Sequence, residues 1–346
     1  MIFSTFNEAT EAVTQFIRTG EGEFGELALA LHSLQVQNVP AYRDLCLTRH
    51  VFVNHWQEIP AVPTTAFRDF EITSLPLEER TAVFHSSGTT GTAFSRHWHD
   101  TSSLAIYEAS LRPWFQTHLE PKNCHTLSLT PPPAEAPHSS LAHMMLTVQH
   151  TSSFAGTNSP NGWEVNADTA QRVCVGAIDC NKPLLIMGPS FSFVEWLNEM
   201  KPSIALPTGS RVMETGGYKG RSQKLPKPEL HALIGRQLGV RPDHIVSEYG
   251  MCELGSQAYD RIVGRTNCPT FRFPDWVRIR IISPETRAEV AEGEAGLLQV
   301  FDLANIRSVL AILTGDLAVR RGDGFELIGR ATAYEPRGCS LALSES

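Results

Sequence analysis

The first sixty residues place apolar side chains at helical spacing. Apolar residues recur three or four positions apart over residues 11–17 and 24–34, which is typical of amphipathic helices. Pro40 interrupts the pattern, and further prolines indicate that residues 59–67 form a connector. We therefore expect residues 1–60 to be mainly helical.

A short apolar run and a second helical pattern enclose a polar loop. Residues 81–84 predict a buried strand, and residues 104–118 predict a helix with Asp100 or Thr101 as its N-cap. Glycines let a backbone approach a phosphate, exposed N–H groups point at its oxygens, and hydroxyls add donors. A phosphate site is therefore predicted, with a polar surface turn as the alternative, in the loop Ser86-Ser87-Gly88-Thr89-Thr90-Gly91. This is not a Walker A loop, because that motif ends in Gly-Lys-Ser/Thr.

The chain then passes through an irregular region before its pattern alternates. Residues 121–163 are expected to be irregular, apart from a helix over residues 139–150, and form either a pocket wall or a surface excursion. From residue 180 onward, strand patterns at 183–188, 210–214 and 244–249 alternate with helix patterns at 191–200 and 228–238.

This alternation predicts a parallel α/β sheet with both faces covered. Ligands bind beyond the carboxyl ends of the strands in such sheets. The turns that follow Phe84, Glu214 and Tyr249 each carry glycine, and we expect them to gather on one rim. After residue 270 the pattern changes, and a β-rich subdomain is predicted with strands at 277–282, 296–301, 317–320 and 325–328.

Composition narrows the function classes. With 29 Lys and Arg against 37 Asp and Glu, the net charge is −8, which argues against nucleic-acid or anionic-membrane binding. No stretch approaches the ~20 apolar residues of a membrane span, and the N-terminus lacks the pattern of a signal peptide. The seven cysteines include no Cys-x-x-Cys pair, so a reducing, cytoplasmic location is expected.

Four stretches stand in a fixed order: the hydroxyl loop, Glu248-Tyr249-Gly250-Met251-Cys252-Glu253, Leu313-Thr314-Gly315-Asp316-Leu317 and Ile328-Gly329-Arg330. Together they resemble the adenylate-forming superfamily of acyl-CoA synthetases, adenylation domains and luciferases. The resemblance implies ATP and Mg²⁺ as cofactors. It also implies the large N-terminal domain of these enzymes, an α/β fold of helix-flanked sheets plus a β-rich subdomain.

The resemblance also implies roles for individual residues. Tyr249 would lie against the adenine, Asp316 would accept the ribose hydroxyls with Arg330 nearby, and Glu253 would bind magnesium. The remaining ATP-binding positions implied are Ser86, Ser87, Gly88, Thr89, Thr90, Gly91, Gly216, Gly217, Glu248 and Gly250. Each residue alone also has an ordinary interpretation, such as a turn carboxylate for Asp316 or a surface cation for Arg330.

Further stretches narrow the resemblance to the acyl-protein synthetases of bacterial bioluminescence operons, the LuxE family. They are Ile59-Pro60-Ala61-Val62-Pro63, the segment 214–221 and Arg337-Gly338-Cys339-Ser340-Leu341. The similarity extends from about residue 40 to the end. It implies that ATP and a fatty acid give an acyl-adenylate, and that the acyl group passes to Cys339 and then to a partner such as a reductase or carrier.

The chain also departs from the wider superfamily. Only sixteen residues follow Arg330, where typical members continue for a domain of ~100 residues that brings a catalytic lysine. We therefore expect an adenylate-forming domain at 1–330, with the subdomain at about 270–330, a tail at 331–346 carrying Cys339, and no small C-terminal domain. Lys219, Arg221 and Arg96 are the candidates to replace the missing charge, and Cys252 stands where the motif has threonine.

Two other functions fit the same residues. The acyl group could pass to coenzyme A or a carrier-protein thiol, or the chain could be a non-catalytic nucleotide- or acyl-binding relative. The acyl pocket is not identified by the pattern, and its expected neighbours are His85, His143, Gly217 and the 130–163 region.

Overall fold

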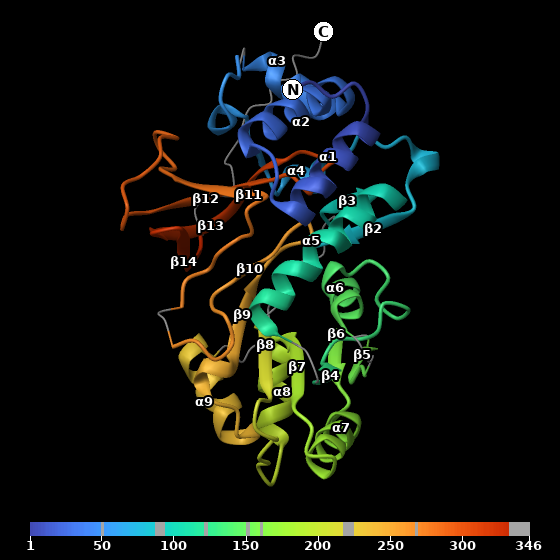
Figure 1. Ribbon diagram of the computed structural model, residues 1–346, viewed down its shortest axis with the longest axis vertical. Helices are drawn as coiled ribbons and strands as arrows, with labels where there is room; N and C mark the ends of the chain where they lie inside the picture. Colours follow the sequence, from blue (N-terminus) through green and yellow to red (C-terminus); the bar gives the residue numbers. More distant parts are fainter. Residues whose placement is uncertain are drawn as a thin grey trace.

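The computed structural model describes residues 1–49, 52–86, 94–120, 124–149, 153–159, 162–216, 225–266 and 269–331. Within these residues the chain has a mixed α/β fold, with two five-stranded sheets and two smaller strand pairs (Figure 1). No helix among these described residues combines the length and apolar character needed to cross a bilayer.

The first sheet is mainly parallel, as the alternation predicted. Its strand order is β10-β9-β8-β7-β4, and only β10 runs antiparallel to its neighbour. The strands are β4 (His125–Ser128), β7 (Leu184–Pro189), β8 (Arg211–Thr215), β9 (Ile245–Tyr249) and β10 (Ala258–Tyr259).

Both faces of this sheet are buried. Successive side chains point to opposite sides of a strand, so neighbouring residues of β7 pack into different apolar clusters. Leu184 and Ile186 face one apolar cluster, which also contains residues of α7 (Ala167–Asp179), α8 (Ser190–Glu199) and α9 (Lys227–Leu238). Leu185 and Met187 face another, with residues of α5 (Thr101–Leu119) and α6 (Ser140–Val148). Two-sided burial explains the nearly continuous apolar runs in the sequence.

The second sheet is built largely from the C-terminal part of the described chain. Its antiparallel strands are β11 (Val277–Ile282), β12 (Ala295–Asp302), β13 (Ala311–Arg321) and β14 (Gly324–Arg330). A short segment from far upstream, β1 (Val62–Pro63), pairs with β13 in parallel. That pairing lies inside the proline-rich connector, where no strand was expected.

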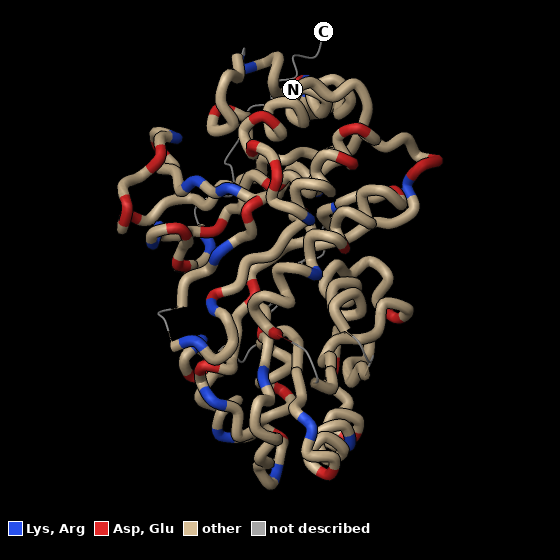
Figure 2. Tube along the Cα trace, in the orientation of Figure 1, with Lys and Arg blue, Asp and Glu red and all other residues tan. Residues whose placement is uncertain are grey.

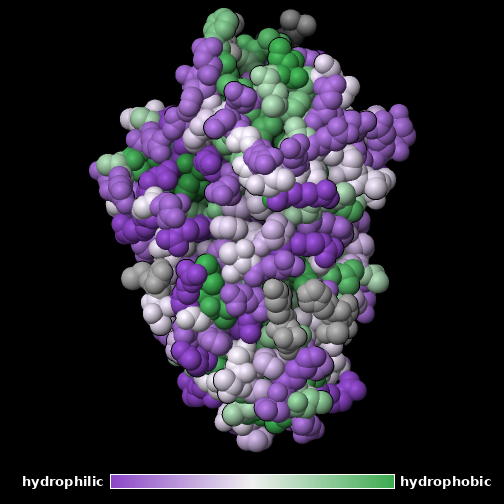
Figure 3. Space-filling view, in the orientation of Figure 1, coloured by the Kyte–Doolittle hydropathy of each residue, from purple (hydrophilic) through white to green (hydrophobic). Residues whose placement is uncertain are grey.

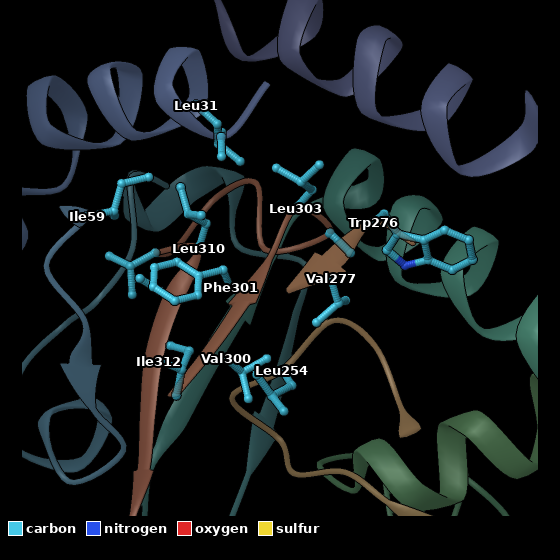
Figure 4. Packing of buried hydrophobic residues seen from close by; sticks show 14 of the residues in the cluster. Leu31, Ile59, Leu254, Trp276, Val277, Val300, Phe301, Leu303, Leu310 and Ile312 are labelled. Atoms are coloured by element: carbon cyan, nitrogen blue, oxygen red, sulfur yellow. The ribbon is translucent and has the colours of Figure 1, made fainter. Parts of the chain in front are cut away.

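The N-terminal helices share a core with this second sheet. They are α1 (Phe6–Thr19), α2 (Phe24–Asn38) and α3 (Pro40–Thr48), and they confirm the helical prediction for the start of the chain. Leu31 of α2 lies over Phe301 and Leu310 in one apolar cluster (Figure 4). The start of the chain and the β-rich segment are therefore joined by burial of apolar surface. Figure 3 shows further hydrophobic side chains exposed at the end of the molecule that carries these helices.

Short elements complete the described fold. They are the helices α4 (Ala66–Asp69), η1 (Trp56–Glu58), η2 (Leu77–Glu79) and η3 (Pro242–His244), and the strands β2 (Ala82–His85), β3 (Arg96–His99), β5 (Gly156–Ser159) and β6 (Gly162–Val165).

Two predictions about strands are corrected. β2 does not join the parallel sheet; it pairs with β3 as an antiparallel hairpin, so the hydroxyl loop connects two strands and not a strand and a helix. The sequence of β3 is too polar to predict a buried strand, yet His97 and His99 are both buried in the structure. The region 121–163 was expected to be irregular, but it contains β4 and β5.

The start of α5 follows the sequence expectation. Asp100 is its N-cap, and the carboxylate accepts a hydrogen bond from the backbone N–H of Ser103 (2.7 Å). Arg307 reaches the same carboxylate from the loop between β12 and β13 (2.8 Å). The helix therefore begins at a point that is also tied to the second sheet.

Candidate active site

A tyrosine, a carboxylate and an arginine meet where the two sheets join. Tyr249 ends β9, and its hydroxyl donates a hydrogen bond to Asp316 Oδ2 (2.8 Å). Asp316 lies on β13 directly opposite Arg330 on β14, and Arg330 Nε is 3.4 Å from Asp316 Oδ1. Three residues from separate motifs are thus brought into one cluster, as the family resemblance implied.

The sequence Thr314-Gly315-Asp316 explains how the carboxylate is presented. The Thr314 hydroxyl donates to Leu298 O (3.0 Å) and accepts from the backbone N–H of Asp316 (3.2 Å). Gly315 has φ +76°, a left-handed conformation that favours glycine, and the ladder between β13 and β14 is irregular just beyond it. The Thr314 hydrogen bonds and the left-handed Gly315 therefore set the local backbone that carries Asp316.

Burial sets the protonation of this cluster. It raises the pKa of Asp316, although the Tyr249 hydrogen bond and the Arg330 charge act in the opposite direction. The pKa of Tyr249 lies well above its usual value, also because of burial, so the phenol remains a donor. The Tyr249 ring packs edge-on against Phe271 and Phe325, with centroids 6.0 and 5.5 Å away. Aromatic faces next to a carboxylate suit a base attached to a sugar with two hydroxyls.

Glu253 lies in the turn that follows β9. The residue is only 4% exposed, and burial raises the pKa of the carboxyl. The neighbouring Cys252 donates its S–H to Glu253 Oε2 (3.1 Å), and Ser95 and Arg330 also act on this carboxyl. A thiol is a weak donor, so the carboxylate keeps acceptor capacity for another ligand.

Glu248 lies on β9 beside the end of β8. The two strands are neighbours in register, with Thr215 opposite Glu248, so the turns after Glu214 and Tyr249 come together as predicted. Burial is the main cause that raises the pKa of Glu248 to about 7. A Cβ atom at position 250 would overlap the Glu248 carboxylate, so a larger residue there would require that carboxylate to shift.

Several expected site residues occupy other surroundings. Ser86 closes the β2–β3 hairpin, where its hydroxyl accepts from the backbone N–H of Ser95 (3.1 Å). Gly216 follows β8 and faces open space. Arg96 Nη2 donates to the backbone oxygen of Arg68 (3.5 Å). The other predicted site residues lie outside the described residues: Ser87, Gly88, Thr89, Thr90, Gly91, Gly217, Lys219, Arg221 and Cys339.

The two histidines expected near the acyl pocket have definite partners. His143 Nε2 lies 2.9 Å from Glu108 Oε1 and ties α6 to α5. His85 stacks on His138, with ring centroids 4.6 Å apart, at the base of the hydroxyl loop. Both arrangements are compatible with a purely structural role.

The residues fit the two cofactors that the resemblance implied. Mg²⁺ at a nucleotide site takes one or two carboxylates, and phosphate oxygens and water complete its shell. Glu253 offers one buried carboxylate of this kind, and the described part of the chain contains no cluster of three or more His, Cys, Asp or Glu that would suggest an all-protein metal cage. Figure 2 shows basic residues interspersed with acidic ones over the trace, so charge alone does not single out the site.

Sequence patterns missed the residues that hold Glu253 in place. Asn305 donates from Nδ2 to the backbone oxygen of Glu253 (3.0 Å), and His97 Nδ1 is 2.8 Å from the backbone oxygen of Cys252. These contacts connect an amide or imidazole to main-chain atoms far away in the sequence. Only the pairing of buried polar groups with partners could have suggested them.

Two solved structures share this fold. An open conformation of 2-hydroxyisobutyryl-CoA ligase, in complex with 2-HIB-AMP and CoA, superposes with a TM-score of 0.61 at 12% identity, covering 87% of this chain and 74% of the other. ATP-bound MatB from Rhodopseudomonas palustris gives a TM-score of 0.51 at 15% identity over 74% of this chain. The chain spans about half of MatB, 49% of its length. At these identities the likeness establishes the fold of adenylate-forming enzymes and nothing finer.

Sequence comparison identifies the family. The long-chain-fatty-acid–luciferin-component ligase of Aliivibrio fischeri is 24% identical over 328 residues, covering 88% of this chain and 83% of the relative. The model of the family described as acyl-protein synthetase, LuxE, matches residues 27–346. Because that match takes in most of the chain, the protein belongs to the LuxE acyl-protein synthetase family.

Proposed function

We propose that the protein activates a carboxylic acid of the fatty-acid class with ATP and then transfers the acyl group to a protein thiol. The observation that carries the proposal is the meeting of Tyr249, Asp316 and Arg330 beside the buried Glu253, within a chain of this family. The printed name of the Aliivibrio fischeri relative, a long-chain-fatty-acid ligase, supports the substrate class.

In the first step, a carboxylate oxygen of the acid attacks the α-phosphorus of ATP. The new P–O bond forms as the bond to pyrophosphate breaks, which leaves an acyl-adenylate. Asp316 would accept hydrogen bonds from the ribose hydroxyls, and the aromatic residues around Tyr249 would hold the base. Glu253 would hold Mg²⁺, which supplies charge neutralisation at the phosphates when bound.

Charged and hydroxyl groups of the chain would supply the remaining stabilisation of the phosphates. Phosphoryl and nucleotidyl transfer need positioning and charge stabilisation more than covalent help from the protein. The hydroxyl loop 86–91 would donate to the phosphate oxygens, and Lys219 and Arg221 would supply cations. The side chain of Arg330 is 83% exposed and borders the cluster, so it is free to reorient toward a phosphate.

In the second step, the Cys339 thiolate would attack the carbonyl carbon of the acyl-adenylate. A thioester forms, AMP leaves with the electrons of the broken C–O bond, and the thiol proton goes to solvent or to AMP. An acyl-accepting protein, such as a reductase or a carrier, would then take the acyl group from Cys339.

Carboxylate-dependent exchange of labelled pyrophosphate into ATP tests the first step, over a panel of fatty and aromatic acids. We expect exchange with fatty acids; its absence with every acid would indicate a non-catalytic binding protein. Labelled acid with ATP and Mg²⁺ tests the second step. We expect a hydroxylamine-labile protein label that is lost in Cys339→Ser while exchange persists. Label transfer directly to coenzyme A, with none on the protein, would favour a CoA ligase.

A further inference from the structure

One buried loop contacts the Glu253 turn and three other parts of the chain at once. It consists of Asp302, the last residue of β12, and of residues 303–309, which lead toward β13; this segment is called the 302–309 loop. Asp302, Asn305 and Ser308 are polar, yet each is at most 1% exposed. Buried polar side chains are retained where they have partners to hold. The contacts of these three residues indicate what the loop holds.

The loop is bonded to the main chain of the turn after β9. Asn305 Nδ2 donates to Glu253 O (3.0 Å), and Asp302 Oδ2 accepts from the backbone N–H of Gly255 (2.9 Å). A Cβ atom at position 255 would lie 2.8 Å from the Cβ of Ala304, so this close approach requires glycine. Two peptide groups on either side of Leu254 are therefore fixed by the loop.

The loop also fixes the peptide group before Glu253, through a histidine. The oxygen of Cys252 can only accept, so His97 donates to it from Nδ1. His97 Nε2 is then the acceptor for the Ser308 hydroxyl (3.0 Å). Burial lowers the pKa of His97 to about 4, which keeps the ring neutral and preserves this donor–acceptor order.

The far side of the loop is held by the N-terminal helices. Gln35 of α2 is fully buried, and its Nε2 donates to Asn305 O (2.7 Å) while its Oε1 accepts from Leu310 N (3.0 Å). Arg307 is paired with the N-cap carboxylate of α5, Asp100 (2.8 Å). The loop cannot shift without breaking bonds to α2 and α5, so it is a rigid support for the Glu253 turn.

We propose that the 302–309 loop positions the Glu253 carboxylate for Mg²⁺ and that Asn305 is the positioning residue. The inference rests on the proposed function, because it needs Glu253 as a metal ligand. With the peptide groups before and after Glu253 held, only its side-chain rotations are left to order when the metal binds. A ligand held in place by outer contacts binds metal more tightly than a free one.

The test measures metal binding and not only activity. Mg²⁺ is titrated by calorimetry into the full-length protein saturated with α,β-methylene-ATP, an analogue that is not cleaved at the reacting bond. Asn305→Ala and Asn305→Asp both remove the donor to Glu253 O. We expect each to weaken Mg²⁺ binding by about tenfold, the lower end for loss of an outer contact to a metal ligand. At saturating Mg²⁺, affinity for the analogue should stay within about twofold of wild type, since Asn305 does not contact the nucleotide cluster.

Two matched variants separate this role from general destabilisation. Asn166→Ala removes another asparagine side chain, the N-cap of α7 that accepts from Thr169 N (2.9 Å), and should leave Mg²⁺ binding unchanged. Ser308→Ala removes only the hydroxyl that donates to His97, and should weaken Mg²⁺ binding by about two- to threefold. It also keeps the test decisive if both Asn305 variants fail to fold.

The possible outcomes are distinct. If Glu253→Gln weakens Mg²⁺ binding and neither the Asn305 variants nor Ser308→Ala do so, the positioning role is wrong while the proposed function stands. If Asn305→Ala only lowers the melting temperature, as Asn166→Ala is expected to do, the loop is structural and the inference fails. If Glu253→Gln also binds Mg²⁺ normally, the metal role of Glu253 and the positioning inference both fail, while pyrophosphate exchange still tests the proposed function separately.

Discussion

The 302–309 loop and the β13–β14 strand pair each bury a carboxylate, but they satisfy it differently. Asp302 in the loop accepts from Gly255 N, Ser256 Oγ and Ala304 N, at 2.9, 2.8 and 2.9 Å. Asp316 on β13 has the Tyr249 hydroxyl and an arginine whose side chain is 83% exposed. Burial raises the pKa of both carboxyls, to about 6 for Asp302.

On this difference, Asp302 is a structural carboxylate and Asp316 is the one proposed to bind a ligand. Three donors of the chain form hydrogen bonds to the Asp302 carboxylate, and removal of that carboxylate would leave these donors unpaired inside the protein. Asp316 is buried beside an aromatic cluster, and its second partner, Arg330, has a side chain that is 83% exposed. Burial and raised pKa values occur in both regions, so the number and rigidity of the donors distinguish them.

Asp302→Ala tests the structural side of the comparison and should have the largest effect. Three buried donors lose their acceptor at 1–3 kcal/mol each, partly offset because a buried carboxylate no longer needs to be desolvated. We expect the free energy of unfolding to fall by about 3–5 kcal/mol. Urea denaturation measures it. Asp302→Asn, which keeps one acceptor oxygen, should lose less. An Asp302→Ala protein of wild-type stability would show that the donors find other partners.

Asp316→Ala tests the ligand side. We expect ATP affinity to fall by ~1.5–3 kcal/mol, because a charge-assisted hydrogen bond to the ribose is lost. The free energy of unfolding should change much less than in Asp302→Ala, since only the Tyr249 hydroxyl loses a buried partner. Titration of ATP followed by Tyr and Trp fluorescence gives the affinity, and urea denaturation gives the stability. If the variant binds ATP like wild type but is strongly destabilised, Asp316 belongs with Asp302 as a structural carboxylate.

A third buried carboxyl, Glu248, tests the comparison through pH. Its pKa of about 7 in the folded protein exceeds the value of 4.5 expected when unfolded. The folded state therefore binds the proton more tightly, and stability falls as pH rises from about 4.5 to 7. Glu248→Gln removes this loss. Above pH 7 the variant should be more stable than wild type by about 2 kcal/mol, after allowing for an unpaired amide hydrogen.

Denaturant melts of both proteins at pH 5 and pH 8 measure this effect. The stability difference should be small or reversed at pH 5 and should grow in favour of the variant at pH 8. A difference that does not depend on pH would mean that Glu248 is already ionised in the folded protein. Glu248 would then be held as an anion by its neighbours, in the way that the donors hold Asp302.

The same residues show how much of the fold and of the candidate site the sequence alone predicts. Tyr249, Asp316 and Arg330 were found because each belongs to a motif, and the structure confirms that they meet. The parallel sheet was predicted because its apolar runs alternate with helical patterns. β3 and β1 were missed, since one is polar and the other is a two-residue pairing within a proline-rich connector.

The residues that hold the site in place follow no pattern in the sequence. Asn305 reaches a main-chain oxygen 52 positions away, and Gln35 reaches the loop from 270 positions away. Hydrogen bonds from a side chain to distant backbone follow neither a helical nor a strand period, so a single sequence cannot register them. Their existence depends on how the N-terminal helices pack on the second sheet, which is decided by the apolar core that both share.

The smallest expected effect concerns Arg330, the exposed partner of Asp316 in the comparison. Its Nε lies 3.4 Å from Asp316 Oδ1, but the side chain is 83% exposed, so the pair should contribute under about 0.5 kcal/mol to stability. If Arg330 reorients toward a phosphate, Arg330→Ala should weaken ATP binding by about two- to fivefold at low salt, and high salt should reduce the difference by screening. Arg321→Ala is the matched control, because it removes an exposed ion pair to Glu326 (3.0 Å) from the same strand pair. ATP titrations at low and high ionic strength compare the two variants. Equal effects of both variants would assign Arg330 to general surface charge and would leave Asp316 as the residue of this strand pair proposed to contact the nucleotide.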